Sequence, residues 1–140
     1  MIVADLEAAA VDPGAWAVLL DIHGNLAEGR GSNIFLVRGG RLATPRAQYV
    51  LPGISRQTVL ELAADLGVPC DQTDLDLYDA CNADEAFLTS TSLCICPVRS
   101  INGSRVGSEQ VFGTITRRLI EAHVQLVDDD FVVPYRRQLD

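Results

Sequence analysis

Short apolar segments separated by turn signals fill residues 16–44, and this pattern constrains the fold more than any other feature. Residues 16–20 (WAVLL) and 32–37 (SNIFLV) have the length and apolar content of strands. His23-Gly24-Asn25 and Arg38-Gly39-Gly40 are typical turn sequences. This part of the chain is therefore predicted to form strands joined by tight turns.

Helical periodicity is clearest in two later segments. A helix is predicted over residues 55–66, with Gly67 as its C-terminal cap and with Ser55 and Thr58 offering N-terminal cap chemistry. A second amphipathic helix is predicted over residues 113–127. Together with the strands, these helices predict a mixed α/β (α+β) fold. The other predicted elements are helices over 1–12 and 75–80, strands over 26–27, 41–44, 85–89 and 95–101, and a hairpin at Asn102-Gly103.

The charge balance excludes two classes of partner. The 140 residues include 19 acidic and 11 basic side chains, which gives a net charge of -8. This balance argues against nucleic acid and against an anionic membrane surface, because both bind through Lys and Arg. All the basic residues are Arg, so no lysine of this chain can form a Schiff base.

The sequence contains no run of 18 apolar residues, so no membrane-spanning segment is predicted. Its first residues include Asp5 and Glu7 and no basic segment, which is unlike a secretory signal. A cytoplasmic location is therefore expected. Its four cysteines are then expected to be reduced thiols. Cys94 and Cys96 would share one face of a strand, and small buried apolar side chains are favoured over a metal pair, so no metal site is predicted.

Three polar, glycine-containing links interrupt the apolar segments. Residues 28–33 place a carboxylate before a strand, where it would bind a protonated ring nitrogen or a cation, or form a solvated turn. Residues 52–55 open a helix, where free N–H groups favour a phosphate, although most helix N-termini bind only water. Residues 89–92 (TSTS) are hydroxyl-bearing and suit an oxyanion, unless the loop satisfies its own backbone.

These links, taken in order, resemble one family. Residues 28–35 (EGRGSNIF), 51–56 (LPGISR) and 85–92 (EAFLTSTS), followed by Pro97-Val98, are similar to the class IV, or fold type IV, aminotransferases that use pyridoxal 5'-phosphate. The resemblance extends over residues 4–127 and implies the family's large C-terminal domain, a curved mixed sheet approaching a barrel with helices outside. Residues 1–127 are then expected to form that domain and 128–140 a tail.

The resemblance also implies roles for individual residues. Glu28 would bind the protonated pyridine nitrogen of the cofactor, and Leu51 would pack against its ring. The expected partners are an amino acid or amine and a 2-oxo acid, and the expected assembly is a homodimer. Gly53 is expected among the cofactor-binding residues. The expected phosphate contacts come from Ile54, Ser55 and Thr91, and the expected substrate-carboxylate contacts from Ser92 and Leu93.

The departures from the family pattern are equally specific. The family's Schiff-base lysine lies upstream of the region matching Met1, so no catalytic residue is assigned here, and an inactive fragment is expected. Ser90 stands where the branched-chain enzymes commonly have Gly, and Cys94-Ile95-Cys96 where they have Glu-x-Thr, which points away from branched-chain substrates. The alternative function is a non-catalytic, self-associating domain that has kept the fold.

Overall fold

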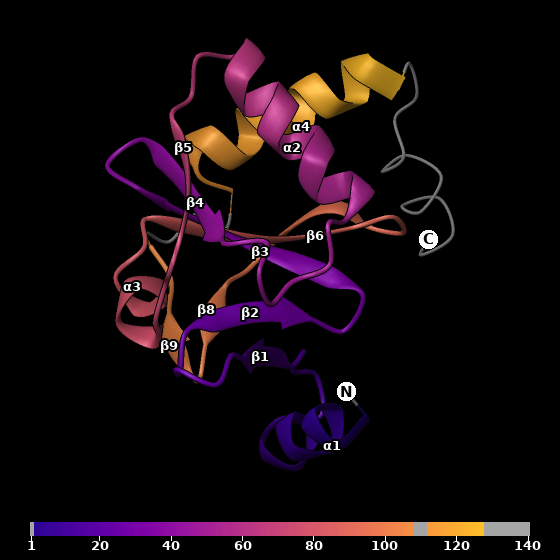
Figure 1. Cartoon of the computed structure of the whole chain (residues 1–140), viewed down its shortest axis with the longest axis vertical. Coiled ribbons are helices and arrows are strands. Elements are labelled where there is room, and N and C mark those ends of the chain that lie inside the picture. The colour runs from indigo at the N-terminus through magenta and orange to yellow at the C-terminus, as the bar shows by residue number, and fades with distance from the viewer. Residues whose placement is uncertain (1, 108–111, 128–140) are drawn as a thin grey trace.

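The computed structural model describes residues 2–107 and 112–127, which form four helices and nine strands (Figure 1). The helices are α1 (Ile2–Val11), α2 (Ile54–Asp65), α3 (Leu77–Cys81) and α4 (Thr114–Val127). The strands are β1 (Val18–Leu20), β2 (Leu26–Gly29), β3 (Ser32–Arg38), β4 (Arg41–Pro45), β5 (Cys70–Thr73), β6 (Glu85–Ser90), β7 (Cys94–Pro97), β8 (Ser100–Ile101) and β9 (Ser104–Arg105). The residues of the predicted tail, 128–140, lie outside the described part.

Seven of the strands form one sheet organised around β3. Strand β6 pairs with β3 along most of its length, from Asn33 to Val37. Strands β2 and β4 pair with opposite ends of β3, at Asn33 and at Leu36, and both must lie along the edge that β6 leaves free. All pairs are antiparallel except β4 with β5, which the crossover through α2 makes parallel. The result is the predicted mixed sheet.

Both faces of the sheet are buried, and each has its own apolar cluster. One cluster lies beneath α2 and α4 and includes Phe35 and Phe87, whose rings stack across β3 and β6 with centroids 5.1 Å apart. The other includes Ile34 and Leu88 and faces α3 and the β8–β9 hairpin. Successive strand residues point to opposite faces, so β3 is apolar along nearly its whole length. Figure 1 shows α2 and α4 on one side of the sheet and α3 on the other.

One predicted strand is wrong, and one strand of the structure was not predicted. The strand expected over 95–101 is divided, because β7 ends at Pro97 and residues 100–101 form β8, which pairs with β9 in a separate two-stranded sheet. The next N–H, of Val98, donates to the carbonyl oxygen of Ala86, and the chain then enters β8. Strand β5 is absent from the predicted elements, because its sequence CDQT is polar and half-exposed and shows no apolar alternation.

The predicted N-terminal cap of α2 is also wrong. The N-cap is Gly53, with φ -62° and ψ 139°, and no side chain in the described part of the chain caps the helix. The Thr58 hydroxyl instead donates to the carbonyl oxygen of Ile54, at 3.1 Å. The predicted C-terminal cap is confirmed: Gly67 adopts φ +67°, the left-handed conformation in which glycine is favoured.

Candidate functional site

The sheet register places three polar side chains in one row. Glu28 of β2 lies opposite Asn33 of β3, and Asn33 lies opposite Thr89 of β6. Directly paired residues point to the same face. Phe35 and Phe87, two residues away from Asn33 and Thr89, face α2 and α4, so this row faces the helices too. Asn33 and Thr89 are buried, and Glu28 is half-buried.

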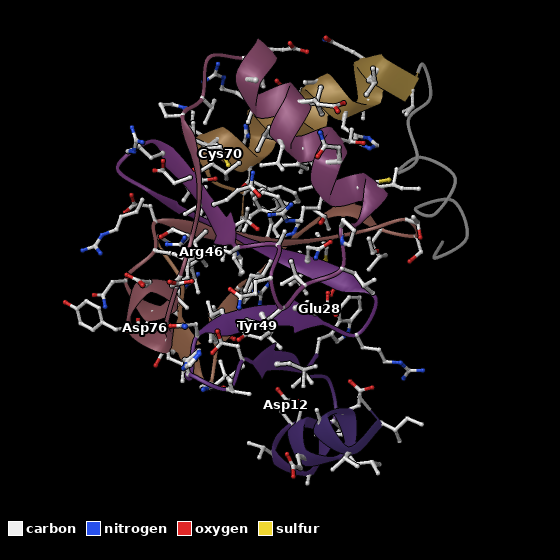
Figure 2. All side chains as sticks on the ribbon, viewed as in Figure 1. Asp12, Glu28, Arg46, Tyr49, Cys70 and Asp76 are labelled. Atoms are coloured by element: carbon white, nitrogen blue, oxygen red, sulfur yellow. The ribbon has the colours of Figure 1, made fainter. Side chains whose placement is uncertain are left out.

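The segment that leads from β4 into α2 crosses this row and is bonded to it. The N–H of Leu51 donates to Oε2 of Glu28 at 2.7 Å. Nδ2 of Asn33 donates to the carbonyl oxygen of the same Leu51 at 3.1 Å. Gly53 packs directly on Asn33, and a Cβ at this position would overlap the Asn33 amide oxygen. Figure 2 shows Glu28 on β2, below the end of α2 at which the helix begins.

The start of α2 is open toward a ligand. With Gly53 as the N-cap, the N–H groups of Ile54 and Ser55 belong to the first turn and have no acceptor within the helix. The helix dipole adds partial positive charge at this end. The apolar side chains of Leu51 and Ile54 are 68% and 78% exposed, so neither is used in the core. This short segment therefore combines unsatisfied donors with apolar surface.

The turn between β6 and β7 lies at the same end of the sheet, because it follows Thr89 by two residues (Figure 1). Thr91, Ser92 and Leu93 are exposed in this turn. The Ser90 hydroxyl accepts the N–H of Leu93 at 3.1 Å. The turn thus satisfies one of its own N–H groups, and this is one of the two groups predicted to contact a substrate carboxylate.

The predicted site residues therefore fall into two groups. The first group belongs to the polar row, contacts it, or directly follows a contacting residue in the sequence: Glu28, Leu51, Gly53, Ile54 and Ser55. The residues at the same end of the sheet, without a hydrogen bond to the first group within the described residues, are Thr91, Ser92 and Leu93.

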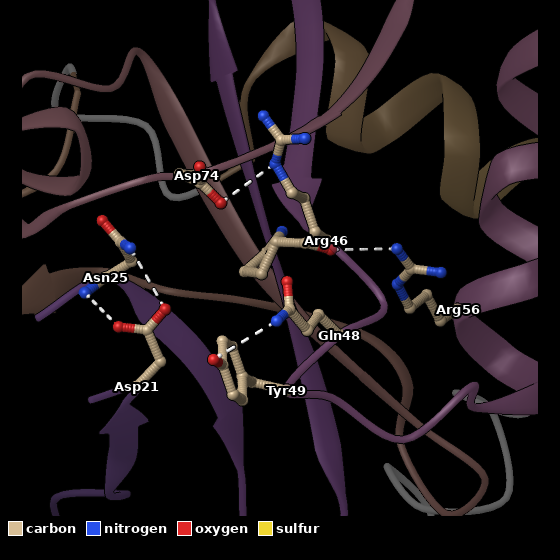
Figure 3. Close-up of polar contacts among 8 residues, drawn as sticks. Asp21, Asn25, Arg46, Gln48, Tyr49, Arg56 and Asp74 are labelled. Carbon is tan, nitrogen blue, oxygen red and sulfur yellow. Dashed lines mark hydrogen bonds and ion pairs between the residues drawn. The ribbon is translucent and has the colours of Figure 1, made fainter. Parts of the chain in front are cut away.

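Three polar residues at this end of the molecule received no individual role from the sequence, although they lie in the quoted segments 28–35, 51–56 and 85–92. Arg56, in the first turn of α2, is only 4% exposed, and its Nη2 donates to Pro45 O at 3.0 Å (Figure 3). The same Nη2 donates to Gln72 Oε1 at 2.8 Å. No carboxylate of the described residues contacts this guanidinium. Burial lowers the pKa of Arg56, but arginine remains protonated in proteins, so its positive charge is uncompensated.

The other two residues without an individual role from the sequence are Asn33 and Thr89. The Thr89 hydroxyl is buried and has no hydrogen-bond partner among the described residues. Side-chain direction alternates along a strand, so Asn33, two residues before Phe35, and Thr89, two residues after Phe87, lie on the same face as those two rings. This signal would have put both side chains on the helix-facing side.

The four cysteines are free thiols, and Cys81 is the exposed one. In the part of the chain that the structure describes, no group of three or more His, Cys, Asp and Glu side chains is arranged to hold a metal ion. Within the same residues, none of the helices has the length and apolar character needed to cross a bilayer. Burial, and secondarily the nearby Asp71 charge, raises the pKa of the Cys70 thiol to about 11.

We expect Cys70 to alkylate much more slowly than Cys81 at pH 8. A thiol with a pKa near 11 is only about one-thousandth thiolate at that pH, and the thiolate is the reacting form. Brief treatment with iodoacetamide, followed by peptide mass spectrometry, measures both rates. Labelling of Cys70 should accelerate as the pH approaches 11. Equal labelling of the two cysteines at pH 8 would contradict the burial of Cys70.

Comparison with known proteins identifies the family. The sequence model of the class IV amino-transferases matches residues 1–101. The chain belongs to the class IV aminotransferase family. It is 37% identical, over 111 residues, to the branched-chain-amino-acid aminotransferase of Pseudomonas aeruginosa. That alignment covers 79% of this chain and 36% of the relative, so the chain spans about a third of the length of the curated relative.

Solved structures of the family share the fold. The branched-chain amino acid aminotransferase from Escherichia coli superposes with a TM-score of 0.80 and 34% identity, over 89% of this chain and 43% of that one. The branched-chain amino acid aminotransferase from Thermobaculum terrenum, solved in its PLP form, gives a TM-score of 0.80 and 37% identity, over 89% and 40%. These likenesses confirm the class IV aminotransferase resemblance and the fold type IV architecture.

Proposed function

We propose that these residues form the part of a class IV aminotransferase that holds pyridoxal 5'-phosphate (PLP). The observation that carries this proposal is the hydrogen bond from Leu51 N–H to Glu28. Leu51 lies only two residues before Gly53, the N-cap residue of α2, which offers no side chain to the free N–H groups of the helix. A carboxylate suited to a pyridinium nitrogen is thereby bonded to the segment that opens a phosphate site. The Thermobaculum terrenum relative, solved in its PLP form, supports the same ligand class.

The residues present fit such a group. Gly53 lies flush against Asn33, which leaves the segment without a side chain where it turns into α2. The uncompensated charge of Arg56 lies beneath the first turn of α2 and favours a dianion there. The exposed side chain of Leu51 offers an apolar surface to a planar ring. One end of the sheet thus combines a hydrogen-bond acceptor for a ring nitrogen, N–H donors and a positive charge for a phosphate, and an apolar surface for the ring.

Each residue would have a simple task. When bound, pyridoxal phosphate supplies the electron sink for charge that develops at the substrate Cα. Glu28 would accept a hydrogen bond from the ring nitrogen and keep a proton on it, and Leu51 N–H would hold the carboxylate in place. Ile54 and Ser55 would donate N–H groups to the phosphate, and the Ser55 and Thr91 hydroxyls would complete its contacts.

The proposed reaction is amino-group transfer between an amino acid or amine and a 2-oxo acid. The relatives are named as branched-chain enzymes, whereas Ser90 and Cys94-Ile95-Cys96 depart from the common branched-chain pattern, so we propose the substrate class only as an amino acid and a 2-oxo acid. The backbone of Ser92 and Leu93 would contact the substrate carboxylate. For this contact, the hydrogen bond from Leu93 N–H to the Ser90 hydroxyl must break. A homodimer and a cytoplasmic location stay predictions.

The 140 residues contain no lysine and so supply no side-chain amine to bond covalently to the cofactor or to move the substrate proton. We propose that this amine comes from outside these residues and that they are inactive alone. Purified chain, incubated with pyridoxal phosphate, an amino acid and a 2-oxo acid, should form no new amino acid. Amino transfer at a rate above the protein-free mixture would disprove this part.

The phosphate contacts are tested by titration calorimetry with pyridoxamine 5'-phosphate, which lacks the reactive aldehyde. We expect the chain to bind it and to bind pyridoxamine, which lacks the phosphate, at least about tenfold more weakly. The Ser55→Ala variant should lose about three- to tenfold in affinity for the phosphorylated ligand, because one hydroxyl donor is gone. The matched control Thr58→Ala, one turn further along α2, should bind like the parent chain. Equal affinity for both ligands would contradict the phosphate site.

A self-associating, non-catalytic domain is the second candidate, and helix α1 favours it. No residue of α1 is buried, and its side chains Ile2, Leu6 and Val11 are 72%, 66% and 90% exposed. An apolar helix this exposed is typical of a covered interaction surface. The Leu6→Asp variant should then lower the mass measured by light scattering. A monomeric parent chain that binds pyridoxamine 5'-phosphate would eliminate this candidate.

A further inference from the structure

We infer that Asn33 is a positioning residue, which fixes the distance between the carboxylate that holds the pyridine nitrogen and the helix start that holds the phosphate. This inference rests on the proposed function and goes beyond it, because Asn33 itself needs no contact with the ligand. Its amide makes two interactions with the segment between β4 and α2, one at Leu51 and one at Gly53.

The first interaction clamps Leu51. The Leu51 backbone is held on both sides by neighbouring strands: its N–H by Glu28 of β2 at 2.7 Å, and its carbonyl by Nδ2 of Asn33 of β3 at 3.1 Å. Because Glu28 and Asn33 are paired across β2 and β3, the two clamps share one rigid row of the sheet. The backbone at Leu51 therefore cannot move along the sheet without breaking one of these bonds.

The second interaction sets the start of the helix. The amide oxygen of Asn33 fills the space where a side chain at position 53 would begin, so Gly53 lies directly on Asn33. Gly53 is the N-cap of α2, and its N–H donates to the carbonyl of Leu51 at 2.8 Å. Asn33 thus contacts the segment on both sides of Pro52. It is 6% exposed, so its amide is held by the surrounding core.

This arrangement has a consequence that a merely stabilising role does not have. A ligand with both a ring nitrogen and a phosphate needs the two ends of the site at a fixed separation, whereas inorganic phosphate uses only one end. The Asn33→Ala variant should therefore bind pyridoxamine 5'-phosphate about tenfold more weakly and inorganic phosphate with unchanged affinity. The Asn33→Asp variant, which keeps the size but replaces the donor by an anion facing a carbonyl, should lose at least as much.

The contact with Gly53 is tested by a double-mutant cycle. Gly53→Ala should weaken pyridoxamine 5'-phosphate binding about tenfold in the parent chain, because the new methyl displaces the Asn33 amide. In the Asn33→Ala background the same substitution should have little further effect. The matched control is Asn82→Ala, at the end of α3 on the other side of the sheet, where the Asn82 amide donates to the carbonyl oxygen of Tyr78; this variant should bind like the parent.

Circular dichroism and calorimetry on the full chain and each variant give a decision in every case. Folded Asn33 variants that bind pyridoxamine 5'-phosphate like the parent would overturn the inference and leave the proposed function standing, provided that the parent binds. The inference would also be overturned if the Asn33 variants lost affinity equally for pyridoxamine 5'-phosphate and inorganic phosphate, and if these losses were additive with that of Gly53→Ala. Asn33 would then have only a general stabilising role. Loss of folding in both Asn33 variants would overturn the inference as well. A parent chain that binds neither ligand would overturn the inference and the proposed function together.

Discussion

Replacing Glu28 by Gln should weaken binding of pyridoxamine 5'-phosphate by about 100-fold at neutral pH. The substitution removes the negative charge that holds the protonated ring nitrogen, and a hydrogen bond to a charged group contributes about 1.5–3 kcal/mol. The amide oxygen of Gln can still accept the N–H of Leu51, so the backbone around the site should be kept. Titration calorimetry measures the affinity.

The matched control for this prediction is Glu61→Gln. Glu61 is an exposed carboxylate on α2 that accepts a hydrogen bond from the Gln57 side chain, at 2.8 Å. The control removes the same charge and should bind like the parent chain. If Glu28→Gln and Glu61→Gln have equal, small effects, net charge explains the affinity and Glu28 has no special role.

Replacing Glu85 by Ala should lower the free energy of unfolding by about 3 kcal/mol, because two hydrogen bonds to its charged carboxylate are lost together. Glu85 begins β6, and its carboxylate oxygens accept the N–H groups of Ile115 at 3.0 Å and Thr116 at 2.7 Å, in the first turn of α4. Gly113 packs directly on the same side chain, so the junction between helix and sheet would lose this contact as well.

Urea unfolding followed by circular dichroism measures this loss. Glu85→Gln should fall between the parent and Glu85→Ala, because the amide keeps one acceptor. Glu121→Ala, on the exposed side of α4, is the matched control and should change stability by less than about 0.5 kcal/mol. A loss of under about 1 kcal/mol for Glu85→Ala would show that α4 is held by its apolar face alone.

The sequence predicts elements well where apolar periodicity is strong. Strands β3 and β6 follow from short apolar runs of strand length, and helices α2 and α4 follow from helical spacing, because burial dictates which residues are apolar. Among the described strands, β5 pairs with β4 alone, at the edge of the sheet, and its polar sequence has no apolar pattern that predicts a strand. Its position follows from the crossover through α2, which is a property of the whole fold.

The candidate site shows the same division. Glu28 and the segment at 52–55 are suggested by local chemistry, a carboxylate and a helix start. Asn33 and Thr89 lie in the polar links, but their individual roles are not suggested locally, because these depend on the register of three strands, which no local pattern fixes. Arg56 has no local signal either, because an arginine on a helix is ordinarily a solvated side chain, and only the fold buries it beneath the first turn of α2.

The most direct test of a single ligand site is an amide chemical-shift titration of the ¹⁵N-labelled chain with pyridoxamine 5'-phosphate. We expect the amides of Leu51, Gly53, Ile54, Ser55 and those of the β6–β7 turn to shift together, with one dissociation constant. A different cavity of about 430 Å³, lined by α1, β7 and β8 residues together with Trp16 and Val98, is also large enough for a small ligand. Shifts confined to that cavity, or to only one of the two expected segments, would contradict the account.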